Sequence, residues 1–424
     1  MKITVIGGGS TYTPELVEGF ARRAAVLPVD ELVLHDLDAE RLRIVGGLAE
    51  RILKRHGFGG RLVTTTDRDS AITDAAAVLI QLRVGGQAAR LTDETMPNRH
   101  GLIGQETTGA GGFAKALRTV PVVLGIADDV RTMAQPDAWI VDFTNPVGIM
   151  TRQLLDAGHR AVGLCNVGIG FQRRVAAAFN VHPDSVRLGH AGLNHLTWIR
   201  SVEVDGVDRL PEWLAGPQAE ELAADIGAPV ALMRTINAIP SYYLHYFYCT
   251  DHELETQRSG NHRATEVMRI EAELLAMYED PELNSLPALL ESRGGAYYSE
   301  AAAALVTSLL TGDGAHHYVN VRNNGTIAGL PDDAVVEVPA LVDRDGPHPV
   351  HVPPMPPEML GLIQEVTAYE VLAGEAARTG DRDVARRALL ANPLVRQWDI
   401  VVPLLDELLE LNRAHLPAFF PNGA

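Results

Sequence analysis

The chain opens with Met1-Lys2-Ile3-Thr4-Val5-Ile6-Gly7-Gly8-Gly9-Ser10-Thr11-Tyr12-Thr13-Pro14-Glu15, an apolar run followed by three glycines and a helix start. Peptide N–H groups in such a turn and the dipole of the following helix together attract a diphosphate. Pro14 suits the first helical turn, and Thr13 is the expected N-cap. This order predicts a dinucleotide site, with an ordinary tight turn as the alternative. The predicted contacts are Gly7, Gly8, Gly9, Ser10 and Thr11.

An acidic residue belongs at the end of the second strand of such a site, where it can bind the adenosine ribose. Leu32-Val33-Leu34-His35-Asp36 supplies it, with Asp36 placed 27 residues after Gly9. Tyr12 stands where the usual fingerprint has its third glycine. Because Asp36 is acidic rather than basic, the sequence favours NAD over NADP.

Length and composition set further bounds. The 424 residues leave room for two domains and a large core. Asp and Glu outnumber Lys and Arg by 54 to 36, which argues against a nucleic-acid partner. Two cysteines give no disulfide framework and fit a reducing cytoplasm. The first strand begins too early for a signal peptide, no apolar run is expected to span a membrane, and so no membrane partner is expected.

The pattern of apolar residues predicts the fold class. Residues 77–82, 138–143 and 160–164 are near-continuous apolar runs, typical of parallel strands buried on both faces. Together with a helical segment over 113–134, they predict an α/β fold with a Rossmann-like doubly wound sheet, which forms an NAD-binding domain over residues 1–170.

After this sheet the pattern changes. Residues 186–190, 197–202 and 335–338 resemble strands of a second sheet, and helical segments follow between them. We therefore expect an α+β domain over residues 171–424, which supplies substrate, metal and oligomer contacts. Its apolar and tyrosine-rich content favours a homodimer or homotetramer.

Ligands in such folds bind beyond the carboxyl ends of the strands, so residues just after each strand are candidates. Arg90 follows the fourth strand, and Asn145 follows the next one, where its amide can bond a sugar hydroxyl or simply shape the turn before Pro146. The glycine-rich loop at 101–112 is either a mobile lid or a surface connection.

Two further residues have side chains that bind metals. Cys165 ends a strand, and His195 follows it by 30 residues; a thiolate and an imidazole can hold a divalent ion whose shell the substrate completes. A buried structural Cys and His are the alternative. Tyr243 lies in a tyrosine-rich segment, where a nearby metal and guanidinium could lower its pKa, and Arg263 is a candidate partner for an anion.

The motifs taken together resemble the NAD- and divalent-metal-dependent glycoside hydrolases of family 4, specifically the 6-phospho-β-glucosidases. The resemblance covers nearly the whole chain. Its motifs are Gly7 to Glu15, Gly104-Gln105-Glu106-Thr107-Thr108-Gly109, Phe143-Thr144-Asn145-Pro146, Cys165-Asn166, Gly192-Leu193-Asn194-His195 and Arg322-Asn323-Asn324-Gly325.

The resemblance implies a hydrolase that is redox-neutral overall. NAD⁺ oxidises C3 of the sugar, the proton at C2 becomes acidic, the aglycone is eliminated from C1, water adds, and NADH returns the hydride. It implies that Cys165 and His195 bind the metal, usually Mn²⁺, and that Tyr243 is the base. The implied substrate contacts are Arg90, Asn145, Asn166 and Arg263. Asn166 stands where related α-glycosidases tend to carry a proposed acid, so the leaving-group acid stays open.

Three other functions remain as alternatives. A family 4 glycosidase could act on α-linked or unphosphorylated sugars, although Tyr243 favours the β class. Thr144-Asn145-Pro146-Val147 is also similar to lactate and malate dehydrogenases, which would make the chain an NAD-dependent 2-hydroxyacid dehydrogenase. An NAD-sensing binding protein is the non-enzymatic alternative.

Overall fold

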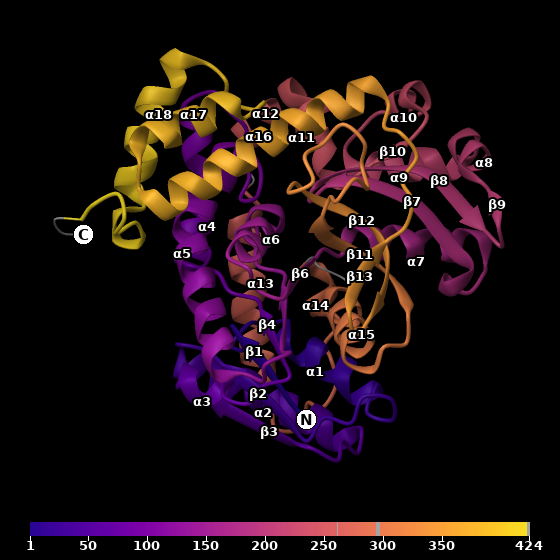
Figure 1. Ribbon diagram of the computed structural model, residues 1–424, viewed down its shortest axis with the longest axis vertical. Coiled ribbons are helices and arrows are strands. Elements are labelled where there is room, and N and C mark those ends of the chain that lie inside the picture. Colours follow the sequence, from indigo (N-terminus) through magenta and orange to yellow (C-terminus); the bar gives the residue numbers. More distant parts are fainter. Residues whose placement is uncertain (261, 294–296, 422–424) are drawn as a thin grey trace.

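The computed structural model describes residues 1–260, 262–293 and 297–421. Its strands form one mixed sheet of 13 strands, ordered β10-β8-β7-β12-β11-β6-β5-β4-β1-β2-β3, with β13 beside β12 and β9 beside β8 (Figure 1). The strands are β1 (Lys2–Ile6), β2 (Glu31–His35), β3 (Arg61–Thr65), β4 (Ala77–Ile80), β5 (Trp139–Asp142), β6 (Ala161–Leu164), β7 (Val186–Leu193), β8 (Leu196–Val204), β9 (Val207–Asp208), β10 (Ile239–Pro240), β11 (Ala315–Arg322), β12 (Val335–Asp343) and β13 (Gly346–Pro349).

The first six strands confirm the predicted doubly wound fold. They are all parallel and lie in the order β3-β2-β1-β4-β5-β6, which is the arrangement of a Rossmann-like sheet. From β1 the chain first adds β2 and β3 on one side, and it then returns to add β4, β5 and β6 on the other side. Since each crossover is right-handed, the helices of the two halves cover opposite faces of the sheet.

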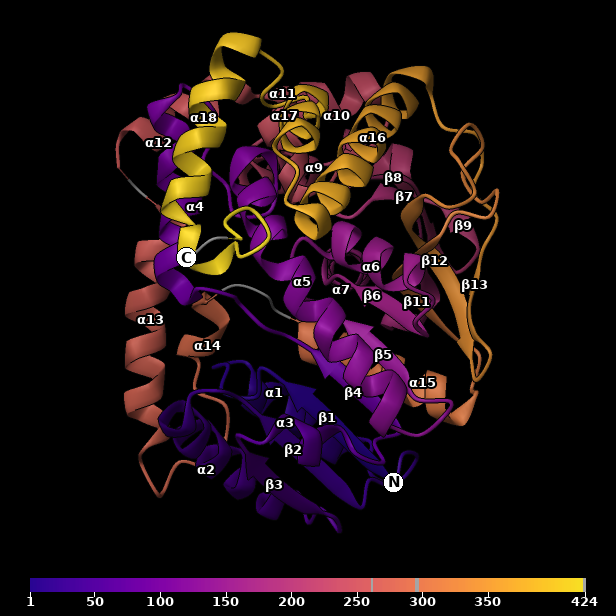
Figure 2. The same ribbon diagram turned by 60° about the vertical axis from the view of Figure 1, so that its left-hand side comes forward.

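Helices cover both faces of the sheet. The last helices of the chain, α16 to α18, lie together at one end of the molecule (Figure 2). Helix α1 packs against α2 and α15, while α5 packs against α3, α4, α6 and α16 (Figure 2). The helices are α1 (Thr13–Arg22), α2 (Ala39–Arg55), α3 (Arg68–Ile72), α4 (Gly86–Arg99), α5 (Gly109–Met133), α6 (Val147–Asp156), α7 (Val167–Phe179), α8 (Leu210–Ala215), α9 (Pro217–Ile226), α10 (Val230–Ile236), α11 (His245–Tyr248), α12 (Thr250–Arg258), α13 (Arg263–Tyr278), α14 (Leu289–Ser292), α15 (Tyr298–Thr311), α16 (Pro357–Thr379), α17 (Arg382–Ala391) and α18 (Trp398–Leu411).

The expectation of a separate second sheet was wrong. The parallel sheet continues through β11, which pairs antiparallel with β6 at Val319 and Leu164, and then through β12, β7 and β8. Strand β11 escaped the sequence analysis because its His, His and Asn residues interrupt the apolar pattern (AHHYVNVR). The predicted domain boundary at residue 170 falls inside α7.

Helix α5 is the core helix of the α/β half. It is long and apolar enough to cross a membrane, contrary to the expectation that no such run exists, but 78% of its most apolar window is buried inside the protein. Its first residues are Gly109 to Gly112, which the sequence analysis placed in a loop.

The start of α1 also differs slightly from the expectation. Thr13 is the first helical residue rather than the N-cap, a position occupied by Tyr12, and Pro14 lies in the first turn as predicted. The glycine turn is therefore followed at once by a helix N-terminus, as a diphosphate site requires.

A buried ion pair ties the last helix to this core. Arg118 on α5 donates to both carboxylate oxygens of Asp93 on α4, at 2.8 and 2.5 Å, and neither side chain is exposed. The same guanidinium donates to Asn412 Oδ1, at the end of α18, at 3.2 Å. Three helices thus meet at one cation.

We predict that Asp93→Ala lowers the free energy of unfolding by about 3–5 kcal/mol, because it leaves the buried Arg118 cation uncompensated. Glu273→Ala is the matched control: Glu273 pairs with Arg269 on the exposed face of α13, and its loss should cost less than about 1 kcal/mol. Urea denaturation of the two variants measures both values. Equal losses would contradict the prediction.

Candidate active site

The candidate site lies where the parallel strands β1, β4, β5 and β6 end. Gly7 follows β1, Arg83 follows β4, Asn145 follows β5 and Cys165 follows β6. These strands are neighbours in the sheet, so their carboxyl ends form one continuous edge.

The glycine turn after β1 packs closely against the neighbouring strand ends. Gly7 has φ +90°, and a Cβ placed there would lie 2.3 Å from the carbonyl oxygen of Gln81. Asp36 accepts hydrogen bonds from the N–H groups of Gly9, at 2.8 Å, and Asp38, at 3.1 Å. A carboxylate has about four acceptor positions, so Asp36 can still bind a hydroxyl pair. Thr11 is buried, and its Oγ1 has no partner among the described residues.

Cys165 and His195 lie in one buried cluster. The Cys165 side chain lies close to those of Tyr298 and Asn194, and Asn194 is the residue next to His195. Burial raises the pKa of the Cys165 thiol above its ordinary value, and the Glu337 carboxylate adds to this. His195 has φ +61°, a conformation rare for residues other than glycine and more frequent at functional sites.

Tyr243 covers the ring of His195. The two rings are stacked with centroids 3.6 Å apart and an angle of 9° between their planes. His195 Nδ1 also lies 3.0 Å from Thr107 Oγ1. Burial lowers the pKa of His195 to about 4, so the imidazole is neutral and can donate a lone pair to a metal ion.

Without a metal ion, the protein does not lower the pKa of Tyr243, so the expected effect of a nearby metal on this pKa stays a prediction. Burial raises it well above its ordinary value, and the neighbouring Cys165 and Glu106 add to this shift. Arg90 opposes the shift. A phenolate at this position therefore requires positive charge beyond what the protein provides.

Cations surround the Glu106 carboxylate beside Tyr243. Arg83 and Lys115 bind Glu106, the latter at 2.6 Å, and Arg90 Nε lies 3.2 Å from it. Although burial alone would raise the pKa of Glu106, these cations hold it well below its ordinary value. Burial lowers the pKa of Lys115 to about 7. Among the described residues, Nη1 and Nη2 of Arg90 have no hydrogen-bond partner, so they can bind an anion.

The remaining predicted substrate contacts are placed differently. Asn145 is half-buried, with Oδ1 unpartnered among the described residues, and Asn166 is the N-cap of α7 directly after Cys165. Arg263 begins α13, where it pairs with Glu266 and donates to the Ser292 carbonyl at 2.7 Å. Among the described residues, no hydrogen bond or ion pair joins Arg263 to the Cys165 cluster, so its role stays a prediction.

Sequence analysis missed the buried carboxylate of Glu337. This residue accepts hydrogen bonds from His190 at 2.8 Å, Asn194 at 2.9 Å and Asn320 at 3.2 Å. The sequence signal that could have indicated Glu337 was its charged side chain inside an otherwise apolar strand, Val335-Val336-Glu337-Val338. Gln105, Glu106 and Thr107 were named only as parts of the glycine-rich loop and of one motif of the family resemblance, without roles of their own. Residues 103 to 109 of this loop are mostly buried, unlike an exposed surface connection.

The residues of this site fit two bound groups, a divalent metal ion and a dinucleotide. The Cys165 thiol and the neutral His195 imidazole are suitable protein ligands for a divalent transition metal. Both lie near Asn194, which is close to Cys165 and directly precedes His195 in the chain. Across residues 1–260, 262–293 and 297–421, no group of three or more His, Cys, Asp or Glu side chains is arranged to hold a metal. Further ligands would therefore come from substrate. The glycine turn and Asp36 fit the diphosphate and ribose of a dinucleotide.

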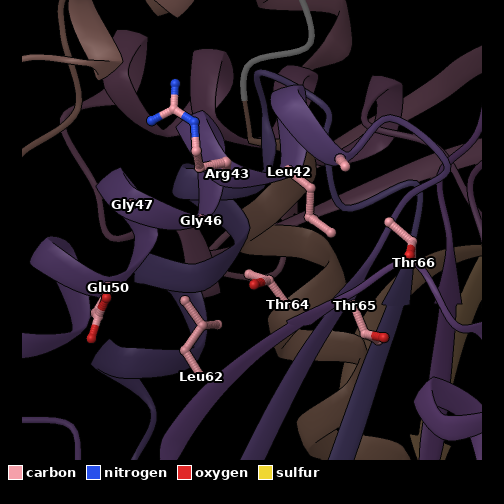
Figure 3. Close-up of a pocket in the computed structure, with 10 residues that line it drawn as sticks. Leu42, Arg43, Gly46, Gly47, Glu50, Leu62, Thr64, Thr65 and Thr66 are labelled. Atoms are coloured by element: carbon pink, nitrogen blue, oxygen red, sulfur yellow. The ribbon is translucent and has the colours of Figure 1, made fainter.

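Of two hollows, one lies away from this cluster and the other lies beside it. The larger, about 560 Å³, is a groove between α2 and β3 that contains one arginine and one glutamate, Arg43 and Glu50, and none of the candidate catalytic residues (Figure 3). A small cavity of about 30 Å³ lies beside His195 and is lined by Thr107, Thr108 and Glu370 among others. Neither hollow displaces the strand-end cluster as the candidate site.

Comparison with known proteins identifies the family of this chain. Residues 2–181 match the model described as family 4 glycosyl hydrolase, and residues 190–395 match its C-terminal domain. A probable 6-phospho-β-glucosidase of Bacillus subtilis is 43% identical over 99% of this chain and 98% of its own length. The structure of the 6-phospho-β-glucosidase from Thermotoga maritima with manganese, NAD⁺ and glucose 6-phosphate has a TM-score of 0.91 and 37% identity, covering 98% of this chain and 99% of that one.

A malate dehydrogenase from Salinibacter ruber shares the fold alone, with a TM-score of 0.57 and 18% identity over 90% of this chain and 99% of its own. The predicted resemblance of the α/β half to lactate and malate dehydrogenases is confirmed at the level of fold.

We predict that Asp36→Ala weakens NAD⁺ binding by about 10- to 100-fold, since hydrogen bonds to a charged group contribute about 1.5–3 kcal/mol. Asp38→Ala is the control, because Asp38 caps α2 through the N–H groups of Glu40 and Arg41 without facing the glycine turn. Asp38→Ala should lower the free energy of unfolding by about 1 kcal/mol and leave the affinity for NAD⁺ unchanged. Calorimetric titration distinguishes the two; unchanged affinity in Asp36→Ala would refute the assignment.

Proposed function

Since this chain belongs to the family 4 glycosyl hydrolases, we propose that it hydrolyses 6-phospho-β-glucosides to glucose 6-phosphate and an aglycone. It uses NAD as a catalytic cofactor and a divalent metal, Mn²⁺ by preference, as do the relatives whose structures contain them. The observation that carries the proposal is the stack of Tyr243 on His195, next to the Cys165 thiol and at the strand edge that begins with the glycine turn.

The residues divide into two binding regions. Residues 1–170 hold the dinucleotide through Gly7, Gly8, Gly9, Ser10, Thr11 and Asp36. Residues 171–424 contribute His195 and Tyr243, which meet Cys165 at the end of β6.

The phosphate of the substrate requires cationic donors. Arg90 supplies them, because its two terminal nitrogens are free of partners among the described residues while Nε is held by Glu94 at 2.7 Å. Asn145 offers an unpartnered buried oxygen to a sugar hydroxyl, and Asn166 lies next to the metal-binding thiol. Arg263 is a further substrate contact in this proposal.

When bound, NAD⁺ accepts and later returns a hydride, and the cation polarises the sugar oxygens. Cys165 and His195 would hold that cation. Tyr243 takes the proton from C2 of the sugar at its phenolic oxygen. Burial disfavours the phenolate, whereas Arg90 and the cation favour it, so proton removal depends on a fully assembled site.

We also propose that the enzyme works in the cytoplasm as a homodimer or homotetramer, without a nucleic-acid or membrane partner. The net charge of −18 argues against a nucleic-acid partner, and the two unpaired cysteines fit a reducing cytoplasm. The apolar and tyrosine-rich content of residues 171–424 supports self-association. A monomeric mass in light scattering would contradict it.

The assay that tests the proposal measures release of p-nitrophenol from its 6-phospho-β-glucoside. We expect release that requires both NAD⁺ and Mn²⁺, and loss of this metal-dependent turnover in Cys165→Ser with NAD⁺ binding retained. No release with any of several divalent metals would defeat the proposal. Release only from the α-anomer or the unphosphorylated sugar would favour the alternative specificity, and stoichiometric NADH from a hydroxy acid would favour a dehydrogenase.

The second test concerns the base. We predict that Tyr243→Phe lowers kcat by about 10²- to 10⁴-fold, the usual contribution of a general base, while NAD⁺ and Mn²⁺ binding persist. In deuterated water, the wild type should place deuterium at C2 of the product. Tyr246→Phe is the control, since that ring lies 6.5 Å from Tyr243 and has no contact with His195. Protium kept at C2 in the wild-type product would exclude C2 deprotonation.

A further inference from the structure

The loop before α5 contains a hydrogen-bond chain that begins at Gln105. Its Oε1 accepts from the backbone N–H of Thr107 and from that of Thr108, the latter at 2.9 Å. Backbone N–H groups can only donate, so the atom that they share must be the amide oxygen rather than the amide nitrogen. The orientation of the Gln105 amide is thereby fixed.

The next link is the hydroxyl of Thr107. Its Oγ1 lies 2.8 Å from the same Gln105 oxygen, and since that oxygen is only an acceptor, Thr107 must donate its one hydroxyl proton to it. Toward any other partner, Thr107 Oγ1 can then only accept.

That other partner is His195. Its Nδ1 lies 3.0 Å from Thr107 Oγ1, and the pair comes from positions 88 residues apart in the chain. Because Thr107 accepts, Nδ1 carries the proton, and Nε2 keeps its lone pair. We propose that Gln105 and Thr107 are positioning residues that fix the tautomer and ring orientation of His195 for metal binding. This inference rests on the proposed function, in which His195 is a metal ligand.

The loop itself is anchored well enough for this role. The N–H of Gly104 donates to Gln257 Oε1 at 2.8 Å, and Glu106 is held by Lys115 at 2.6 Å. Stacking on Tyr243 restrains the plane of the His195 ring. The hydrogen bond to Thr107 then selects which nitrogen is protonated, as partners of metal-binding histidines commonly do.

The test measures Mn²⁺ binding to the full chain with NAD⁺, by electron paramagnetic resonance of free Mn²⁺. Thr107→Val keeps the shape of the side chain and removes the acceptor, so we expect Mn²⁺ affinity to fall by about 10- to 100-fold. Thr107→Ser restores the hydroxyl and should restore affinity. NAD⁺ affinity should be the same in all variants, which separates positioning from loss of folding.

Thr108→Val is the matched control. Thr108 also contacts Gln105 Oε1, through its N–H and, at 3.4 Å, its hydroxyl, but makes no hydrogen bond to His195, so Mn²⁺ affinity should not change. Cys165→Ser marks the loss of a direct ligand. If the wild type and Cys165→Ser differ but Thr107→Val binds like the wild type, the positioning role is overturned. If the wild type binds no Mn²⁺, the proposed metal site fails, and this inference fails with it.

Discussion

The structure around the site depends on one buried carboxylate. Glu337 is 1% exposed and accepts hydrogen bonds from His190 on β7, Asn194 in the turn after β7, and Asn320 on β11. Burial alone would raise the pKa of Glu337, but His190 and Asn194 hold it below its ordinary value. A single anion thus fixes the register of three adjacent strands and the turn that presents His195. Without such donors, a buried carboxylate would be strongly destabilising.

The same environment sets the chemistry of the thiol and the phenol. Burial raises the pKa of Cys165 and of Tyr243, and nearby carboxylates raise both further. Each group is therefore neutral unless a positive charge offsets its desolvation. In the proposed function, a divalent cation held by Cys165 and His195 would supply such a charge, and Arg90 supplies another next to Tyr243. The reactive ionisation states are thereby linked to assembly of the site.

Sequence reasoning succeeded where a local pattern determined the outcome. The glycine turn, the parallel strands and the order of Asp36, Asn145 and Cys165 at strand ends follow from short-range apolar patterns and the rule for ligand sites in α/β sheets. It failed at β11, where two of the polar residues that interrupt the apolar pattern have tertiary partners: His317 pairs with Ser308 at 2.8 Å, and Asn320 donates to Glu337. Such long-range compensation leaves no periodic signal. The contact between Thr107 and His195 is likewise invisible, because nothing local indicates which loop will reach an imidazole 88 residues away.

The continuity of the sheet explains why the two proposed metal ligands can come from different halves of the chain. Cys165 ends the last parallel strand, whereas His195 lies in a hairpin of the antiparallel region, with β11 and β12 between them. Had these regions been separate sheets, relative motion would have altered the spacing of the ligands. Backbone pairing of β6 with β11, β11 with β12 and β12 with β7 fixes that spacing instead. A two-residue ligand set can thus be held in place by main-chain hydrogen bonds, which leaves the remaining coordination positions to substrate.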